Sequence, residues 1–215
     1  MDGWVLAGGA STRMGRDKAL LEIDGRPLIA LALDKIRALG FTPRIAGSRP
    51  DLAAFAPFVP DNFPGCGPLA GIEAALRASD ADLHLFLPVD LPSLPVQFLQ
   101  WMIRRAEGSH AAATIPVLAG RPQPLCAVYN RRLLPRLRKA LEAGRFKVMT
   151  AVEAAAAGQP IDAFEVEILA ASLIPASWPA VPPIQDWFRN VNTPDEYDLL
   201  RSTHSTGAKP RNPIS

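Results

Sequence analysis

The feature that most constrains this 215-residue chain is its opening, where an apolar run breaks into a loop of glycines and hydroxyl side chains. Residues 4–7 are typical of a buried strand, and Gly8 and Gly9 follow at once. Because glycine has no Cβ, the backbone N–H groups of such a loop can approach an anionic ligand closely. Arg13 and Lys18 add positive charge further along the loop. The opening therefore predicts an α/β protein with a cradle for a triphosphate after its first strand.

Neither of the two common phosphate-binding loops is present. A Walker loop needs four residues between its glycines and then Gly-Lys-Ser/Thr, and the dinucleotide fingerprint needs G-x-G-x-x-G. In this chain the glycines of the loop fall at positions 8, 9 and 15. A plain glycine-rich turn after a first strand is the structural alternative, and the cations of the loop favour phosphate binding over it.

Apolar runs alternate with amphipathic segments, which is the pattern of an α/β fold with a mostly parallel sheet. We expect strands near residues 4–7, 43–46, 57–60, 83–89, 111–116, 124–129 and 187–191, and helices near 27–39, 68–79, 95–107, 131–143 and 194–201. Pro27 suits a first helical turn, and Gly40 suits the end of that helix. The proline-rich segment 171–186 has no clear period, so we expect an extended connection over the surface.

Length and composition fit one domain over residues 1–202, followed by a polar tail at 203–215 that we expect to be disordered. The chain has 23 basic and 21 acidic residues, a balance that argues against partners such as nucleic acid or an anionic membrane. Cys66 and Cys126 imply no disulfide framework. No apolar stretch is long enough for a membrane span, and no leader pattern opens the chain, so we expect a cytoplasmic protein.

The segment from Leu6 to Lys18 resembles the signature loop of the nucleotidyltransferases that act on molybdopterin and on sugar phosphates, and within them the molybdenum cofactor guanylyltransferases. Three later segments fit the same family in its order and at roughly its spacing, and they lie at residues 67–72, 88–92 and 190–196. The resemblance implies a Rossmann-like three-layer sandwich of the nucleotide-diphospho-sugar transferase type. It also implies that Leu6, Ala7, Gly8 and Gly9 contact the nucleotide, while Arg13 and Lys18 act in catalysis.

Asp90 follows the most apolar run of the chain, residues 83–89. Ligands of open α/β sheets bind outside the carboxyl ends of the strands, and Mg²⁺ prefers carboxylate and phosphate oxygens. We therefore expect Asp90 to hold Mg²⁺ on the nucleotide phosphates and to share in catalysis and nucleotide binding. The structural alternative is an aspartate that caps the next turn.

Three further positions are assigned by the resemblance. Asp61 matches an acidic residue used for guanosine recognition, and Gly71, near the start of the next helix, would let the nucleotide approach. Asn192 is a second candidate for the metal, although the Asn-Thr-Pro sequence that contains it is also a helix N-terminus signature. The family's asparagine after the second strand falls on or near Ala46, so the ribose or base contact of that loop is either made by Ser48 or lost.

The residues expected to bind the acceptor substrate are indicated by weaker sequence signals. Arg121 lies in a segment that resembles the acceptor side of the family, and Arg145 and Lys147 follow Gly144. These cations are expected to contact the phosphate of the pterin, although a solvated Arg or Lys is the usual case. His84 lies in an apolar run and is expected to be structural.

The predicted reaction is transfer of GMP from Mg-GTP to the terminal phosphate of molybdopterin, with release of pyrophosphate. Related cytidylyltransferases resemble this loop with alanine at the position of Gly8, so Gly8 favours GTP. A molybdopterin cytidylyltransferase, a sugar-1-phosphate nucleotidyltransferase and a non-catalytic GTP-binding regulator remain alternatives. The resemblance also implies transient contact with molybdenum cofactor biosynthesis proteins or recipient molybdoenzymes.

Overall fold

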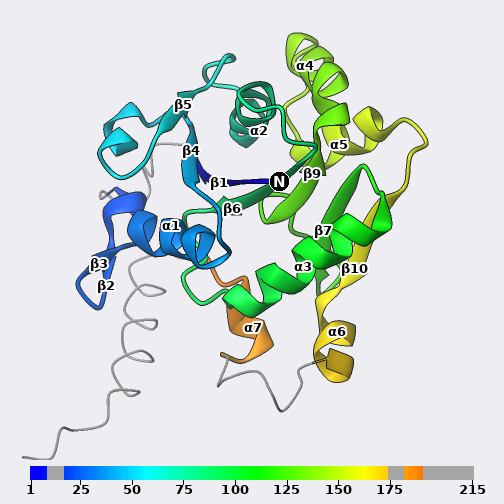
Figure 1. Cartoon of the computed structure of the whole chain (residues 1–215). Coiled ribbons are helices and arrows are strands. Elements are labelled where there is room, and N and C mark those ends of the chain that lie inside the picture. The colour runs from blue at the N-terminus through cyan, green and yellow to red at the C-terminus, as the bar shows by residue number, and fades with distance from the viewer. Residues whose placement is uncertain (9–16, 174–181, 191–215) are drawn as a thin grey trace, which may run out of the picture.

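The computed structural model describes residues 1–8, 17–173 and 182–190, and a central sheet runs through this part of the chain (Figure 1). The strands follow the order β10-β7-β9-β6-β1-β4-β5, and β8 pairs with β7. Their bounds are β1 Asp2–Ala7, β4 Pro43–Gly47, β5 Phe58–Pro60, β6 Leu83–Pro88, β7 Ala113–Leu118, β8 Arg121–Pro122, β9 Ala127–Asn130 and β10 Ile161–Glu165. A separate two-stranded sheet joins β2 (Glu22–Ile23) to β3 (Arg26–Pro27).

The strand directions bring four strand ends together. β1 pairs in parallel with both β4 and β6, and β4 pairs in parallel with β5. The carboxyl ends of β1, β4, β5 and β6 therefore meet at one edge of the sheet. β9 runs antiparallel to β6 and to β7, so the sheet is mixed but mostly parallel.

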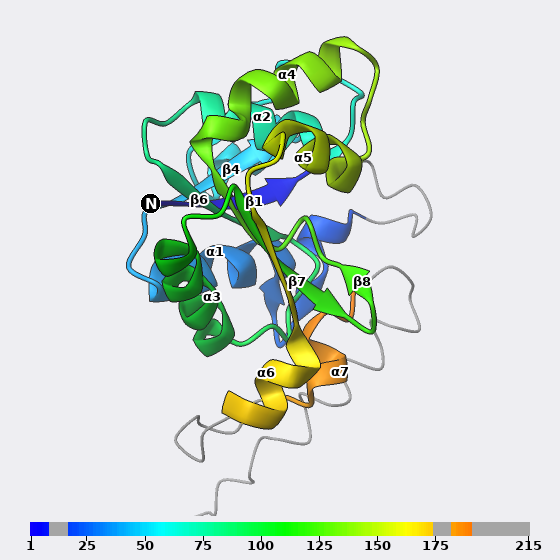
Figure 2. The same cartoon turned by 90° about the vertical axis from the view of Figure 1, so that its right-hand side faces the viewer.

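Helices cover both faces of the sheet, as Figures 1 and 2 show. α1, α3 and α7 lie on one face, and α2, α4 and α5 lie on the other. The helix bounds are α1 Leu28–Ala38, α2 Pro68–Arg77, α3 Val96–Ser109, α4 Leu134–Glu142, α5 Val148–Ala156, α6 Val166–Leu173 and α7 Ile184–Trp187. Three short 3₁₀ helices are η1 Lys18–Leu20, η2 Pro50–Ala54 and η3 Arg131–Leu133.

Each face of the sheet has its own apolar core because strand side chains alternate between faces. Val5 of β1 packs with α1 and α3, whereas Trp4 and Leu6 pack with α2, α4 and α5. α1 buries Leu28, Ile29, Ala32, Leu33 and Ile36, the spacing of one helix face. The result is the expected three-layer α/β sandwich.

Most predicted elements are confirmed within one to three residues at either end. Pro27 precedes the first residue of α1, and Gly40 ends that helix with φ of +86°. The prediction did not include α5, β10 or α6, nor the two-residue strands β2, β3 and β8. The expected helix at 194–201 and the tail at 203–215 lie outside the described residues.

Two predictions near the C-terminus are wrong. The expected strand at 187–191 is not formed by its described residues, because Trp187 ends helix α7 and Phe188 lies in a turn. Both rings are buried and pack on Phe98 of α3, with centroids 5.3 and 5.7 Å away. The expected extended connection at 171–186 is also wrong at both ends, where α6 runs to Leu173 and α7 begins at Ile184.

Candidate active site

A pocket of about 220 Å³ opens at the carboxyl edge of the sheet. Its lining includes the following residues that the sequence predicts to bind nucleotide: Leu6, Gly8, Lys18, Asp61, Gly71 and Asp90. Ala7 lines an adjoining recess together with Gly8 and Lys18. The site sits where β1 is flanked by β6 on one side and β4 on the other, the switch point at which open α/β sheets bind ligands.

The ends of four parallel strands supply these residues. Gly8 follows β1, Gly47 ends β4, Asp61 follows β5, and Asp90 lies just beyond β6. The backbone N–H of Asp61 donates to the carbonyl oxygen of Gly47 at 3.1 Å, which ties the loop after β5 to the end of β4. Segments far apart in the sequence therefore meet in the pocket.

Two glycines are required here by close approach. A Cβ on Gly47 would stand 2.2 Å from the carbonyl oxygen of Ala7, and its φ of +147° also disfavours other residues. A Cβ on Gly71 would lie 3.3 Å from Leu6 Cδ2 and 3.5 Å from Asp61 Oδ1. The first turn of α2 can therefore pack closely on the floor of the pocket.

Lys18 and Asp90 form the charged centre of the pocket. Lys18 Nζ donates to Asp90 Oδ2 at 2.5 Å, and their side chains are only 15% and 17% exposed. A cation and a carboxylate at this depth interact more strongly than on the surface, because less water screens them. The pair joins the start of η1 to the loop just after β6.

Asp17 holds Lys18 in place, and Arg49 holds Asp17. Asp17 Oδ1 accepts from the backbone N–H of Ala19 at 3.0 Å and so caps η1, which begins at Lys18. The guanidinium of Arg49 binds both carboxylate oxygens of Asp17 and also pairs with Asp51. These hydrogen bonds hold the pKa of Asp17 below its ordinary value. Arg49 was not predicted, since its partner lies in another loop of the chain.

Asp61 has an unsatisfied oxygen in the pocket. Its Oδ1 is buried and accepts no hydrogen bond in the described structure. Burial, and then the charge of Glu73, raise the pKa of Asp61 to about 6. A buried carboxylate oxygen without a donor is unfavourable, so this atom is suited to accept from a ligand.

Lys35 supports the loop that carries Asp90 and was not predicted either. Its Nζ, on α1, donates to the carbonyl oxygen of Pro92 at 2.7 Å. Burial lowers the pKa of Lys35 to about 8. The sequence offered no signal for this contact, because the α1 pattern shows only which face is apolar.

The acceptor candidates do not line this pocket. Arg121, Arg145 and Lys147 are exposed. Figure 2 shows β8 and the connection between α4 and α5 on the side toward which β1 points, the side of the pocket. Gly9, Arg13 and Asn192 lie outside the described residues.

Other sequence expectations have a plain outcome. Ala46 is fully buried and lines the pocket, so this position offers no polar side chain to a ligand. Cys66 and Cys126 are free thiols.

Among the described residues, no group of three or more His, Cys, Asp and Glu side chains is arranged to bind a metal. None of the helices described combines the length and apolar character needed to cross a membrane.

Known proteins resemble the chain in sequence. The family model for the MobA-like NTP transferase domain matches residues 3–157. A molybdenum cofactor guanylyltransferase of Vibrio atlanticus strain LGP32 is 33% identical over 151 residues, which is 68% of this chain and 77% of the relative. A probable molybdenum cofactor guanylyltransferase of Bacillus cereus strain Q1 is 30% identical over 202 residues, or 91% and 92% of the two chains.

A solved structure agrees with the sequence relatives. Molybdopterin-guanine dinucleotide biosynthesis protein A from Archaeoglobus fulgidus superposes with a TM-score of 0.78 at 25% identity, covering 96% of this chain and 100% of that one. The chain belongs to the MobA-like NTP transferase family and is an enzyme, a nucleotidyltransferase.

Proposed function

We propose that this enzyme transfers GMP from Mg-GTP to the terminal phosphate of molybdopterin, releasing pyrophosphate and giving the guanine dinucleotide form of the cofactor. The observation that carries the proposal is one pocket that Gly8 lines together with a lysine–carboxylate pair and, on another strand end, an unsatisfied carboxylate oxygen. The first group suits phosphates, and the second suits a nucleobase with N–H donors. The names of the relatives supply the guanine nucleotide and the pterin acceptor.

The transfer exchanges one phosphate bond for another. A terminal phosphate oxygen of the acceptor attacks the α-phosphorus of GTP in line, and the bond between the α-phosphorus and the bridging oxygen to the β-phosphate breaks. Pyrophosphate takes the electron pair of that bond. Since the acceptor oxygen is already anionic, the enzyme needs no strong base, and its tasks are positioning and charge neutralisation.

The residues at the end of β6 fit a magnesium ion bound with the nucleotide. Mg²⁺ is usually held by one or two carboxylates together with substrate phosphates, so the single carboxylate of Asp90 is sufficient on the protein side. When bound, the ion would neutralise charge on the phosphates. Lys18, 2.5 Å from Asp90, would then turn its ammonium group to the phosphates. Arg13 and Asn192 are proposed to assist, as cation and as metal ligand.

Guanine is the proposed base. A carboxylate can accept from both the N1 and the N2 donors of guanine, whereas adenine has an acceptor at N1. Asp61 Oδ1 is the atom suited to this contact. A Cβ on Gly8 would meet only Ser48 Oγ within the described structure, at 3.8 Å, so an alanine there would reduce the space for a ligand without straining the protein.

Arg121, Arg145 and Lys147 are proposed as contacts for the acceptor. They are exposed and belong to segments on the pocket side of the molecule (Figure 2). Their place outside the nucleotide pocket is compatible with a second substrate that approaches from the open side.

The proposal is tested by pyrophosphate release with GTP, ATP, CTP and UTP, each with and without molybdopterin. We expect release with GTP that requires both molybdopterin and Mg²⁺. Asp90→Asn should keep the thermal midpoint and lose the response to Mg²⁺, because the shape is retained and the charge is not. A preference for CTP would indicate a cytidylyltransferase, and turnover with a sugar phosphate alone would indicate the sugar-1-phosphate class.

A further inference from the structure

Two buried side-chain oxygen atoms among the described residues lack a hydrogen-bond partner, and they belong to neighbouring carboxylates. One is Asp61 Oδ1, in the pocket, and the other is Oε1 of Glu73, on α2. Glu73 is fully buried, and its charge acts on Asp61. Unsatisfied buried oxygens are uncommon in folded proteins, so two that interact suggest a built feature.

Glu73 is tied to the residue that follows Asp61. Its Oε2 accepts from Asn62 Nδ2 at 2.7 Å, and Asn62 Oδ1 in turn accepts from a guanidinium N–H of Arg77 at 2.8 Å. Arg138 of α4 lies 3.8 Å from Glu73 Oε1, and its guanidinium stacks over the ring of Phe63 at 5.7 Å. The start of the loop between β5 and α2 is thus held by side chains from two helices.

The loop needs this support because it has little regular structure of its own. Gly65 and Gly67 take φ of +78° and +70°, and the segment from Asp61 to Gly67 contains no helix or strand. Within the segment, Cys66 N–H donates to the carbonyl of Phe63 and Cys66 Sγ to the carbonyl of Pro64, and neither hydrogen bond involves Asp61. The backbone N–H of Asp61 is held by the carbonyl oxygen of Gly47 at 3.1 Å, and the side chain of Asn62 adds an anchor on the helix side, at Glu73.

Stability does not explain a glutamate at position 73. α2 also buries Leu69, Ile72 and Leu76, whereas the side chain of Glu73 contacts Asn62 and lies near Arg138. Burying a carboxylate carries a large desolvation penalty that its partners only partly offset. Apolar replacements of buried ion pairs are often neutral or stabilising. What Glu73 supplies, and an apolar side chain would not, is an acceptor for Asn62 in the loop.

We propose that Glu73 and Asn62 are positioning residues that set the nucleobase preference, by holding the loop so that Asp61 Oδ1 faces the base. This inference rests on the proposed function, in which that oxygen accepts from guanine. Asn62 and Glu73 need not touch the nucleotide. Loss of their hydrogen bond should weaken recognition of the base and leave binding of the triphosphate unchanged.

The test is calorimetric titration of the full chain with Mg-GTP, Mg-ITP, Mg-ATP and Mg-CTP at pH 8. At this pH Asp61 of the wild type is ionised, because its pKa is about 6, and the Glu73 variants remove the negative charge that helps to raise it. The variants are Asn62→Ala, Glu73→Leu and Glu73→Gln. Glu153→Leu, at an exposed glutamate of α5, is the matched control.

For Asn62→Ala and Glu73→Leu we expect the Kd for GTP to rise about tenfold, the scale of one hydrogen bond, while the Kd for ATP stays within about twofold. The preference for GTP over ITP should shrink as well, because ITP lacks the N2 donor. Glu73→Gln keeps an oxygen that can accept from Asn62, so it should retain the preference. The control should match the wild type.

The inference is overturned if Asn62→Ala, an exposed position that the fold should tolerate, discriminates among the four nucleotides as the control does. It is also overturned if all four affinities fall together, since that would indicate general damage to the pocket. A wild type that prefers another nucleotide would contradict the proposed function instead. Asn62→Ala would then still decide whether the loop sets that preference.

Discussion

Lys18 is the residue whose loss should be most damaging to turnover. Its ammonium group pairs with Asp90 at 2.5 Å and would face the charge that develops on the α-phosphate and on pyrophosphate. Lys18→Ala should lower kcat/KM by roughly 10²-fold or more, the scale of one preorganised charge-stabilising group. Lys139→Ala, at an exposed lysine of α4, is the matched control. Steady-state kinetics that are equal in the two variants would remove Lys18 from the reaction.

Asp61 should make GTP binding depend on pH. Its pKa of about 6 means that the carboxylate is ionised at pH 7.5 and takes up a proton as the pH falls through about 6. The protonated form loses acceptor capacity toward the two guanine donors, so the affinity for GTP should fall below pH 6 while the affinity for ATP should not. Titrations between pH 5 and 8 check this. Asp61→Asn should bind GTP weakly at every pH, and a wild-type profile in that variant would contradict the assignment.

At the residue scale, the sequence predicted which site residues follow the ends of strands. It did not predict which side chains contact one another in the site. Asp90 follows an apolar run and Gly8 follows another, and both line the pocket as parallel strand ends should. Arg49, Lys35 and Glu73 could not be found in this way. Each acts on a partner brought near by the fold, and a charged residue gives no sign in the sequence of which distant atom it meets.

At the scale of elements, the short helix η1 depends on the loop after β4. Arg49 binds Asp17, which caps η1 and so places Lys18. Arg49→Met should lower kcat/KM about 10- to 100-fold, because a small misplacement of a charged group has effects of this size. The thermal midpoint should change little, since partly exposed ion pairs contribute about 1 kcal/mol or less.

Arg26→Met is the control for that prediction, because Arg26 also pairs with an aspartate, Asp34, but lies on the exposed surface. It should leave both kcat/KM and the midpoint unchanged. If Arg49→Met behaves like Arg26→Met, the loop after β4 does not position η1.

Elements with a regular apolar pattern were predictable, and elements fixed by tertiary packing were not. α1 shows a helical repeat of buried residues, and β6 is an apolar run interrupted only by His84. The apolar and polar residues of β10 alternate only weakly, and Phe164 is its one buried residue. β10 pairs with β7, which is far from it in the sequence. Trp187 and Phe188 looked like strand residues, whereas their rings are buried because α3 presents Phe98 to them.

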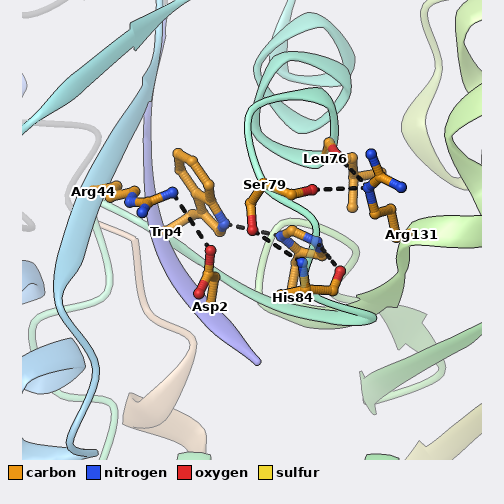
Figure 3. Close-up of polar contacts among 8 residues, drawn as sticks. Asp2, Trp4, Arg44, Leu76, Ser79, His84 and Arg131 are labelled. Atoms are coloured by element: carbon orange, nitrogen blue, oxygen red, sulfur yellow. Dashed lines mark hydrogen bonds and ion pairs between the residues drawn. The ribbon is translucent and has the colours of Figure 1, made fainter.

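At the scale of the whole molecule, a buried histidine, His84, lies near the amino ends of the strands, away from the pocket (Figure 3). Trp4 Nε1 donates to His84 Nδ1 at 3.0 Å, so the proton of the neutral ring is on Nε2. His84 Nε2 then donates to the carbonyl oxygen of Ala81 at 2.8 Å. The close-up also shows Arg44 reaching Asp2 beside this pair. The network joins the amino ends of β1, β4 and β6 and is remote from the site.

His84 should make stability fall in acid. Burial lowers the pKa of His84, whereas the unfolded chain has a histidine pKa of about 6.5. Below about pH 6.5 the unfolded state therefore binds a proton that the folded state excludes, and the free energy of unfolding falls by at most about 1.4 kcal/mol for each pH unit. The free energy of unfolding stops falling from this cause once the pH is below the pKa of His84 in the folded protein.

Urea unfolding of the wild type and His84→Gln between pH 5 and 8 measures this contribution. The difference in unfolding free energy between the two proteins should shrink as the pH falls, because glutamine does not titrate. Asp61, whose pKa is raised on folding, acts in the opposite direction and cancels in the comparison. A difference that stays constant over this range would show that His84 does not govern the acid response.

The central claim is that the α-phosphorus of GTP passes to the pterin. The most direct measurement uses GTP labelled at the α-phosphorus in one reaction and at the γ-phosphorus in a second, each with molybdopterin and Mg²⁺. We expect the α label in a product that also contains the pterin, and the γ label in pyrophosphate. Transfer of the γ label to the acceptor, or no transfer of the α label to it, would contradict the account.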